Sequence, residues 1–446
     1  MNSVFKSSIR HFIHTKINSG VILLFVALVA MIVANSPLKE AYDNFFSQEL
    51  VLSVGGYNLF QVHGENMTIM SFINDALMVI FFFSVGLEIK HEMLVGELSS
   101  FRKALLPIVA ACGGMIVPIV LFALICPEGV ASRGAAIPMA TDIAFSLGVL
   151  SLLGSRVPLS LKIFLTALAV VDDIGGIIVI GAFYSSNLEL LYLLLAAFFV
   201  LVLSVGGRFG VHNWFFYIFF GSIVWWLFLN SGIHPTIAGV IVAFTIPARS
   251  KYDIPRSVGE IRESLAKLPE TNDMIRKNYT PSNSDLDVLR GVEYASSHVV
   301  SPLQAMSDWL QPIVNYLVMP LFAFANASIT FEGFSMGDVQ GVTLTVFIAL
   351  VFGKLLGIFS FSWISIKCKW LRMPDRMDNR GLFGMSMLGG IGFTVSLFLA
   401  NLSYTSVPEV GATLLNQAKM GIIGGSVFAG ICGYLLLSYF YPKKEQ

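Results

Sequence analysis

The sequence predicts an all-α, polytopic membrane protein, and three observations support this fold class. Of its 446 residues, 55% are hydrophobic and only 13% are charged, about half the charged share of a soluble domain. The mean hydropathy is +0.76. Apolar runs of about 20 residues, the length that spans a bilayer, recur along the whole chain. A lipid bilayer is therefore the expected surrounding, and residues 1–446 are expected to form one membrane transporter domain. The formal net charge of zero gives no reason to expect a nucleic-acid partner.

Hydropathy predicts about twelve membrane spans. The eighth is short, and the fourth and eleventh are interrupted by Pro or Gly. The predicted spans lie near residues 18–36, 67–88, 104–126, 134–153, 159–184, 188–206, 212–230, 233–248, 311–330, 341–366, 381–402 and 412–440.

The first span is expected to be a membrane helix and not a secretory signal. Its apolar run, Ser19 to Asn35, is longer than a typical signal core, and no clear cleavage site follows it. Basic residues set the orientation, because Lys and Arg concentrate in cytoplasmic segments. This rule predicts an even number of spans with both termini cytoplasmic. It places all of the Lys and Arg residues in cytoplasmic segments except four, which are Lys39, Arg133, Lys354 and Lys419.

Two loops stand out between the spans. Residues 50–62 alternate apolar and polar around a Gly-Gly pair, which predicts a small β-hairpin on the outer side. Such a hairpin either pairs with a second copy, giving a homodimer, or folds against its own chain. Residues 249–308 form a polar cytoplasmic insert with a short amphipathic helix in VGEIRESLAKL and a disordered stretch after it. The insert is either a solvated linker or a regulatory tether.

The chemistry is expected to centre on two adjacent aspartates. Asp172 and Asp173 are the only charges between Ile163 and Tyr184. A carboxylate at the bilayer centre costs about 2.5–3.5 kcal/mol on insertion scales, and repulsion between neighbours favours protonation of one of them. A chain has little structural reason to accept that cost. The pair is therefore predicted to be a proton and cation site.

Two interrupted spans are predicted to contribute to the same site. In the fourth span, Thr141 and Asp142 follow Pro138 within one turn. In the eleventh span, glycines cluster at residues 389–392. Each span is the middle member of a group of three, spans 3–5 and 10–12, and paired broken helices in inverted repeats indicate a transporter site. Unwound backbone at membrane depth is tolerated only where it is buried in protein or lines a cavity.

Lys354 is a lone cation in the tenth span, and it is expected to pair with one of these aspartates or with helix carbonyl ends. The oxygens of Asp142, Asp172, Asp173 and Thr141 are hard ligands that suit Na⁺ or Li⁺. A carboxylate cannot hold a proton and a metal ion together, so competition at Asp172 and Asp173 provides an exchange mechanism that depends strongly on pH. No cofactor and no enzymatic activity are expected.

Seven motifs spread over nearly the whole chain identify a family resemblance. They are ATDIAFSLGVLSLLGSRVPLSLKIFLTALAVVDDIGGI, FINDALMVIFFFSVGLEIKHE, SGIHPTIAGVIVAF, VMPLFAFANA, VFGKLLGI, GGIGFTVSLFLANL and AKMGIIGGS. These motifs resemble those of the NhaA family of bacterial sodium/proton antiporters. The resemblance implies twelve helices, two of them broken, in the bacterial inner membrane, and electrogenic exchange regulated by pH. It implies that Asp173 is the main ligand of the transported Na⁺, with Asp172 as its partner.

The resemblance also implies a charged cytoplasmic mouth that sets the response to pH. Glu88 and Glu92 match part of it, but His91 stands where an Arg is expected. The segment SPLQAMSDWLQP, which contains Asp308, is less acidic and has fewer histidines than expected. These departures from the family pattern fall on residues that are expected to set the pH at which exchange is active. Asp75 is expected to line the cytoplasmic side of the route, or else to be a capped polar residue. His234 matches a family histidine, but it equally fits a hydrogen-bonded packing residue.

Three other classes of protein fit the sequence less well than a cation/proton antiporter. A sodium-coupled solute symporter of the same architecture has no need of adjacent aspartates that exchange protons for cations. An intramembrane aspartyl protease would need a catalytic water between Asp142 and Asp172, and it would leave Lys354 without a role. A passive channel would need a filter-like repeated loop, which the sequence lacks.

Overall fold

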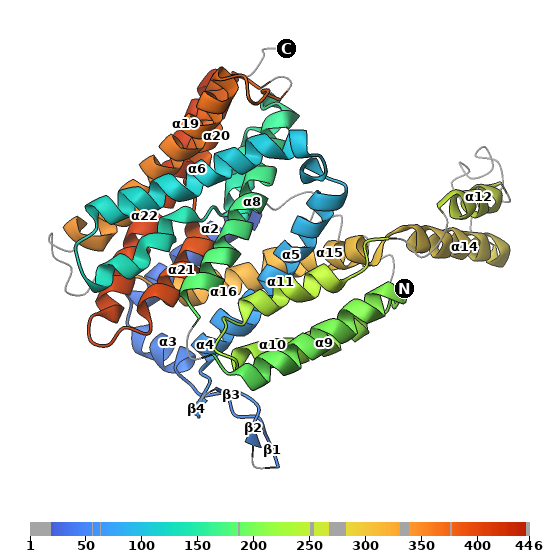
Figure 1. Ribbon diagram of the computed structural model, residues 1–446, viewed down its shortest axis with the longest axis horizontal. Coiled ribbons are helices and arrows are strands. Elements are labelled where there is room, and N and C mark those ends of the chain that lie inside the picture. The colour runs from blue at the N-terminus through green and yellow to red at the C-terminus, as the bar shows by residue number, and fades with distance from the viewer. Residues whose placement is uncertain are drawn as a thin grey trace.

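The protein is a bundle of apolar helices with a small β-hairpin region at one end (Figure 1). The computed structural model describes residues 19–442 apart from Gly56, His63 and the segments 186–187, 250–253, 267–281, 331–338 and 375–376. The basic residues before Ser19 and most of the stretch predicted to be disordered lie outside the described residues.

In the described part of the chain, six continuous helical segments are long and apolar enough to cross a membrane, or nine segments if each strongly bent pair is counted as one. They confirm a helical, multi-pass membrane protein. Two shorter apolar helices, α10 (Trp214–Leu229) and α11 (Thr236–Thr245), pack among them. Four of the six are single helices: α6 (Phe101–Ile125), α8 (Leu159–Phe183), α9 (Leu190–Arg208) and α22 (Gly411–Phe440). The segment Ile69–Leu94 contains α4 (Ile69–Phe72) and α5 (Met78–Leu94). The segment Gly341–Lys367 contains α18 (Leu344–Ile348) and α19 (Lys354–Lys367).

Three bent pairs complete the apolar helices. Helix α2 (Ser19–Ala34) turns by 111° into α3 (Lys39–Phe46), so the chain runs on as a helix after the first predicted span. The 3₁₀ helix η3 (Val130–Met139) meets α7 (Ile143–Leu152) at 45°, and α20 (Asn379–Leu388) meets α21 (Phe393–Tyr404) at the same angle. These last two breaks fall where the sequence predicts interrupted helices.

The two breaks lie against each other at the centre of the bundle. The backbone N–H of Asp142 donates to the carbonyl of Ile391 at 2.7 Å, and the Ser396 hydroxyl donates to the carbonyl of Ile137 at 2.8 Å. Gly392 allows this approach, because a Cβ there would lie 3.1 Å from the Ala140 carbonyl oxygen and would collide with the Ser396 hydroxyl. Hydrogen bonds between the two breaks thus satisfy backbone groups that the unwound turns leave free.

Helices α6 and α19 are in close contact through glycines. A Cβ on Gly357 would collide with the carbonyl oxygen of Gly113, and a Cβ on Gly113 would collide with that of Gly357. Small residues let helix backbones approach closely in membranes. Because Lys354 lies one turn before Gly357, this contact sets the position of the lysine.

Among the described residues, four π-helical turns interrupt the helices, and three of them contain or adjoin residues of interest here. Ile73–Leu77 contains Asp75, Val314–Val318 contains Asn315, and Ala349–Gly353 ends immediately before Lys354. The fourth is Val339–Thr343. A π-turn shifts the face that the following residues present, and such turns are frequent at functional sites.

The segment before Ile69 forms two small antiparallel strand pairs. Strands β1 (Ser53–Val54) and β2 (Tyr57–Asn58) pair antiparallel, and β3 (Gln61–Val62) pairs with β4 (Glu65–Asn66). The Trp226 indole of α10 donates to the Leu59 carbonyl at 3.2 Å, which joins this region to the bundle. The sequence indicates only the first of the two pairs.

The insert contains helices that stand apart from the bundle. Helices α12 (Ile254–Leu265) and α14 (Asn283–Val299) pack together at the end of an arm (Figure 1). Ser282 and Asp285 form a capping box that begins α14. Helix α15 (Pro302–Ile313) then leads back to α16 (Met319–Asn326) inside the bundle.

Candidate functional site

The two adjacent aspartates of α8 face different surroundings. Both side chains are buried. Successive residues on a helix point about 100° apart. Asp172 therefore faces α19 and the break before α7, whereas Asp173 lines a cavity between α5, α7 and α15.

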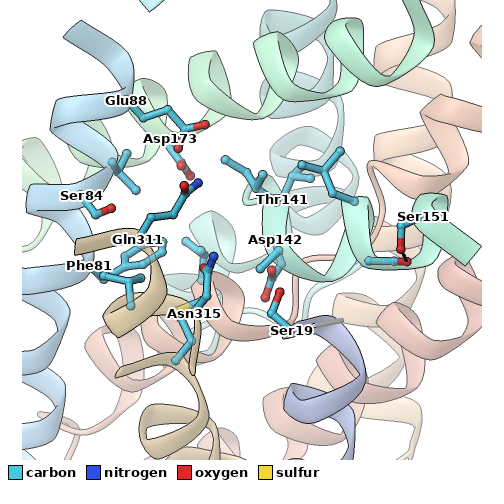
Figure 2. A pocket seen from close by; sticks show the side chains of 18 residues that line it. Ser19, Phe81, Ser84, Glu88, Thr141, Asp142, Ser151, Asp173, Gln311 and Asn315 are labelled. Atoms are coloured by element: carbon cyan, nitrogen blue, oxygen red, sulfur yellow. Dashed lines mark hydrogen bonds between the residues drawn. The ribbon is translucent and has the colours of Figure 1, made fainter. Parts of the chain in front are cut away.

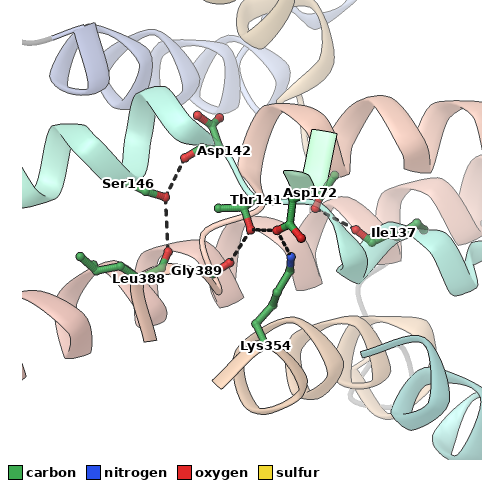
Figure 3. A network of polar contacts seen from close by, with 9 residues as sticks. Ile137, Thr141, Asp142, Ser146, Asp172, Lys354, Leu388 and Gly389 are labelled. Atoms are coloured by element: carbon green, nitrogen blue, oxygen red, sulfur yellow. Dashed lines mark hydrogen bonds and ion pairs between the residues drawn. The ribbon is translucent and has the colours of Figure 1, made fainter. Parts of the chain in front are cut away.

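Asp172 is held in a polar network (Figure 3). The Lys354 ammonium donates to Asp172 Oδ2 at 2.5 Å, and both side chains are fully buried. The Thr141 hydroxyl lies 2.6 Å from the same oxygen and 3.0 Å from the Gly389 carbonyl, and it can donate its single proton to either one. A buried charge needs such partners, since either member of the pair alone would be strongly destabilising.

Asp142 joins the N-termini of two half-helices. It is the N-cap of α7, and its Oδ1 accepts from the Phe145 N–H at 2.9 Å. Its Oδ2 accepts from the N–H of Thr394 at 3.1 Å and from the Thr394 hydroxyl at 2.5 Å, at the start of α21. One buried carboxylate thus faces the positive ends of two helix dipoles.

Asp173 lines a cavity of about 220 Å³ (Figure 2). Its Oδ2 has no hydrogen-bond partner among the described residues, and neither does Asp172 Oδ1. Buried carboxylate oxygens in native proteins are nearly always satisfied, so two such atoms on neighbouring residues mark a place for protons or cations. The lining residues are Ser19, Phe81, Ser84, Val85, Glu88, Thr141, Asp142, Ile143, Ala144, Leu147, Gly148, Ser151, Asp173, Gln311, Val314, Asn315, Met319 and Val395.

Of the residues predicted at the cytoplasmic mouth, the structure brings only Glu88 to this cavity. Glu92 lies one turn further along α5, and its Oε2 accepts from the Glu97 N–H at 2.9 Å. His91 lies between them on the same helix but does not line the cavity. Asp308 on α15 is exposed and accepts from the Gln304 amide at 2.7 Å.

Asp75 and His234 lie elsewhere in the molecule. Glu88 follows Asp75 by 13 residues on the same helical segment, a rise of about 20 Å, so the two do not share one mouth. Asp75 lies two turns from Thr68 at the end that carries the strands. There His234 Nε2 is 3.8 Å from Asp75 Oδ1, and His234 Nδ1 is 2.8 Å from the Thr236 hydroxyl.

Several polar residues of the site were not singled out in the sequence. Thr394 lies two residues after the glycine cluster, in the first turn of α21. Gln311 and Asn315 are four residues apart, the spacing of one helix face, and Ser84 and Glu88 share that spacing. Lys90 donates to the carbonyls of Phe244 and Ile246 at the end of α11. Among the described residues, no three His, Cys, Asp or Glu side chains form a group that could hold a metal ion.

Crossed broken helices and a cavity lined by a buried, unpaired carboxylate define a class, the membrane transporters of small cations. Sequence comparison then specifies the family. The model of the family Na+/H+ antiporter 1 matches residues 10–437. The chain belongs to this family, which confirms the resemblance to NhaA proteins.

Individual relatives match over nearly their whole length. The Na(+)/H(+) antiporter NhaA of Bacteroides fragilis is 52% identical over 440 residues, covering 98% of this chain and 99% of that protein. The NhaA of Parabacteroides distasonis is 50% identical, with 99% and 98% covered. The NhaA of Sulfurimonas denitrificans is 40% identical, with 96% and 94% covered.

Proposed function

We propose that this protein is a secondary active antiporter that exports Na⁺, or Li⁺, in exchange for protons across the bacterial inner membrane. One observation carries the proposal. Asp173 is buried, its Oδ2 is unpaired, and it lines a cavity next to a second aspartate that is already paired with a lysine. The relatives are named as Na⁺/H⁺ antiporters, which supports the same reading.

Competition for Asp173 couples the movement of Na⁺ to the movement of protons, and the proton gradient drives the exchange. When Na⁺ binds to the carboxylate, the proton that neutralised it leaves, and when a proton returns it displaces the Na⁺. Alternating access then exposes the site to one side of the membrane at a time. In each state the Asp173 carboxylate carries either a proton or Na⁺, so its negative charge is never buried without a compensating partner. Side chains alone carry this chemistry, so no cofactor is needed.

The neighbouring residues have distinct roles in this mechanism. Asp142 neutralises the two half-helix N-termini, and Thr141 holds Asp172 against the α20 break. Lys354 compensates Asp172 in the state described here, and Asp172 releases Lys354 when it takes up a proton or contacts the cation. With two aspartates available, two protons can enter for each Na⁺ that leaves, which makes the exchange electrogenic.

We place the cavity on the cytoplasmic side, with both termini in the cytoplasm. Its lining includes Ser19 at the start of α2 and Ser151 at the end of α7, both at helix ends that the basic residues assign to the cytoplasm. Glu88 is the acid nearest to Asp173 on the wall formed by α5, so it is the first candidate for pH regulation, with His91, Glu92 and Asp308 further out. Asp75 and His234 belong to the opposite, outer half of the route.

The strands between α3 and α4 are proposed to join two copies in a homodimer. They lie at the outer end under this orientation, and the exposed side chains around them include Val51, Leu52 and Leu59. Short strand edges next to exposed apolar side chains can pair with the same elements of a second copy.

The exchange is tested by sodium-driven proton movement in everted vesicles. The intact chain should dissipate a preformed pH gradient when Na⁺ is added, and Asp173→Asn should not. Asp287→Asn is the matched control, because Asp287 is exposed on α14 and should leave the activity intact. If the intact chain moves no protons at any pH, the antiporter proposal is wrong, and sodium-coupled solute uptake is the next function to test.

A further inference from the structure

Two neutral amides, one on helix α15 and one in the π-turn that follows it, line the cavity that contains Asp173. They belong to Gln311 and Asn315. Figure 2 shows the Gln311 amide pointing from α15 towards the Asp173 carboxylate, with Asn315 close to it. The described residues give neither amide a hydrogen bond, whereas Gln304 on the same helix donates to Asp308.

The backbone of α15 is irregular where these amides lie. Pro312 follows Gln311 directly and lacks the N–H that would continue the helix ladder. After Ile313, the five residues Val314–Val318 form a π-turn that contains Asn315. A π-turn shifts the face that the following residues present, and such turns are frequent at functional sites.

The carboxylates at the site leave few oxygen atoms free to bind a cation. Both oxygens of Asp142 accept hydrogen bonds from half-helix N-termini, and Asp172 Oδ2 is bound to Lys354. Hard cations bind through several oxygen ligands that replace their water shell. The unpaired carboxylate oxygens beside the cavity are too few to replace that shell.

We propose that the side-chain carbonyls of Gln311 and Asn315 are further ligands of the transported cation, which bind it together with Asp173 on the cytoplasmic side. This inference rests on the proposed exchange function. Amide oxygens bind a metal ion without binding a proton at ordinary pH. The two amides therefore favour Na⁺ over the proton. The titratable groups that line the cavity are Glu88 from α5, Asp173 from α8 and Asp142 before α7, and none comes from α15.

The test compares Gln311→Leu and Asn315→Leu with the intact chain and with Gln304→Leu as the matched control. Direct binding of radioactive Na⁺ to purified protein and exchange in liposomes are measured over a range of pH. Each cavity variant should raise the Kd and the KM for Na⁺ about tenfold, the effect of ~1.4 kcal/mol. The factor should be the same at every pH, since proton binding to Asp173 is untouched. Maximal rate and the control should be unchanged.

Two results would overturn the ligand role while the intact chain still exchanges Na⁺. One is an unchanged Kd in both variants. The other is a factor that varies with pH, which would mean that the variants act through protonation of a carboxylate. If a Leu variant fails to fold, Gln311→Ala and Asn315→Ala give the same readouts with less bulk. If the intact chain neither binds nor exchanges Na⁺, the proposed function fails first, and this inference falls with it.

Discussion

At the residue scale, neighbouring aspartates have opposite surroundings. Asp172 is bound to Lys354 and Thr141, whereas Asp173 lines a cavity and its Oδ2 has no hydrogen-bond partner in the described part of the chain. The sequence indicates that these two residues and Lys354 belong together, because buried charges need partners. Which aspartate pairs with the lysine depends on how α8 is rotated against α19, and hydropathy carries no information on that rotation.

Replacing Lys354 tests the buried ion pair. Lys354→Met removes one partner of Asp172 and should lower the stability by about 3–5 kcal/mol, because an uncompensated charge remains buried. Adding Asp172→Asn should restore most of the loss. Thermal unfolding in detergent measures both variants. Equal instability of the single and the double variant would show that the pair is not what stabilises this region.

Thr394 gives a second prediction at this scale. Thr394→Val keeps the shape of the side chain but removes the hydroxyl bond to Asp142, and it should cost about 1.5–3 kcal/mol because the acceptor is charged. Thr394→Ser keeps the hydroxyl and serves as the control. Denaturation midpoints provide the comparison. A valine variant as stable as the serine variant would mean that Asp142 is compensated by the helix N-termini alone.

At the element scale, the broken helices and the glycine contacts position the site. Pro138 and the glycines at 389–392 indicate both breaks from the sequence, and the structure has them between η3 and α7 and between α20 and α21. The sequence does not indicate the π-turns beside Asp75, Asn315 and Lys354, since hydropathy does not register one extra residue in a helical turn. Asp75 and Glu88 lie well apart on one helical segment, which composition could not indicate because it does not order residues along a span, and the roles of both residues stay predictions.

The α6–α19 contact can be tested with a single methyl group. Gly357→Ala should push α19 away from the Gly113 carbonyl, displace Lys354 from Asp172, and lower both stability and exchange. Gly176→Ala is the matched control, because Gly176 is also buried in a helix but has open space around its Cβ position. That control should be tolerated. Unfolding temperature and vesicle exchange are the readouts, and equal effects of the two substitutions would exclude the close contact as the cause.

At the scale of the whole molecule, hydropathy and basic residues predict a multi-pass helical membrane protein, and the structure confirms that class. The number of spans stays a prediction, since short and bent helices do not meet a length criterion. The sequence predicts a short amphipathic helix where α12 lies, but it indicates neither α14 nor the pairing of the two helices, because α14 is too polar to stand out.

The proposed dimer belongs to this scale. Replacing residues 51–66 with a short Gly-Ser linker removes the strands and should convert a dimer in mild detergent into a folded monomer. Light scattering after size-exclusion chromatography measures the mass, and Na⁺ exchange in liposomes verifies the fold. A dimer that persists without the strands would place the interface on the helices.

The central claim is that Na⁺ and protons compete for Asp173, and the most direct measurement is calorimetric titration of purified protein with Na⁺. Titrations in two buffers with different ionisation enthalpies count the protons released as Na⁺ binds. We expect proton release on binding, an affinity for Na⁺ that falls as the pH is lowered, and no binding by Asp173→Asn. Na⁺ binding without proton release, or equally tight binding by Asp173→Asn, would contradict competition at this carboxylate.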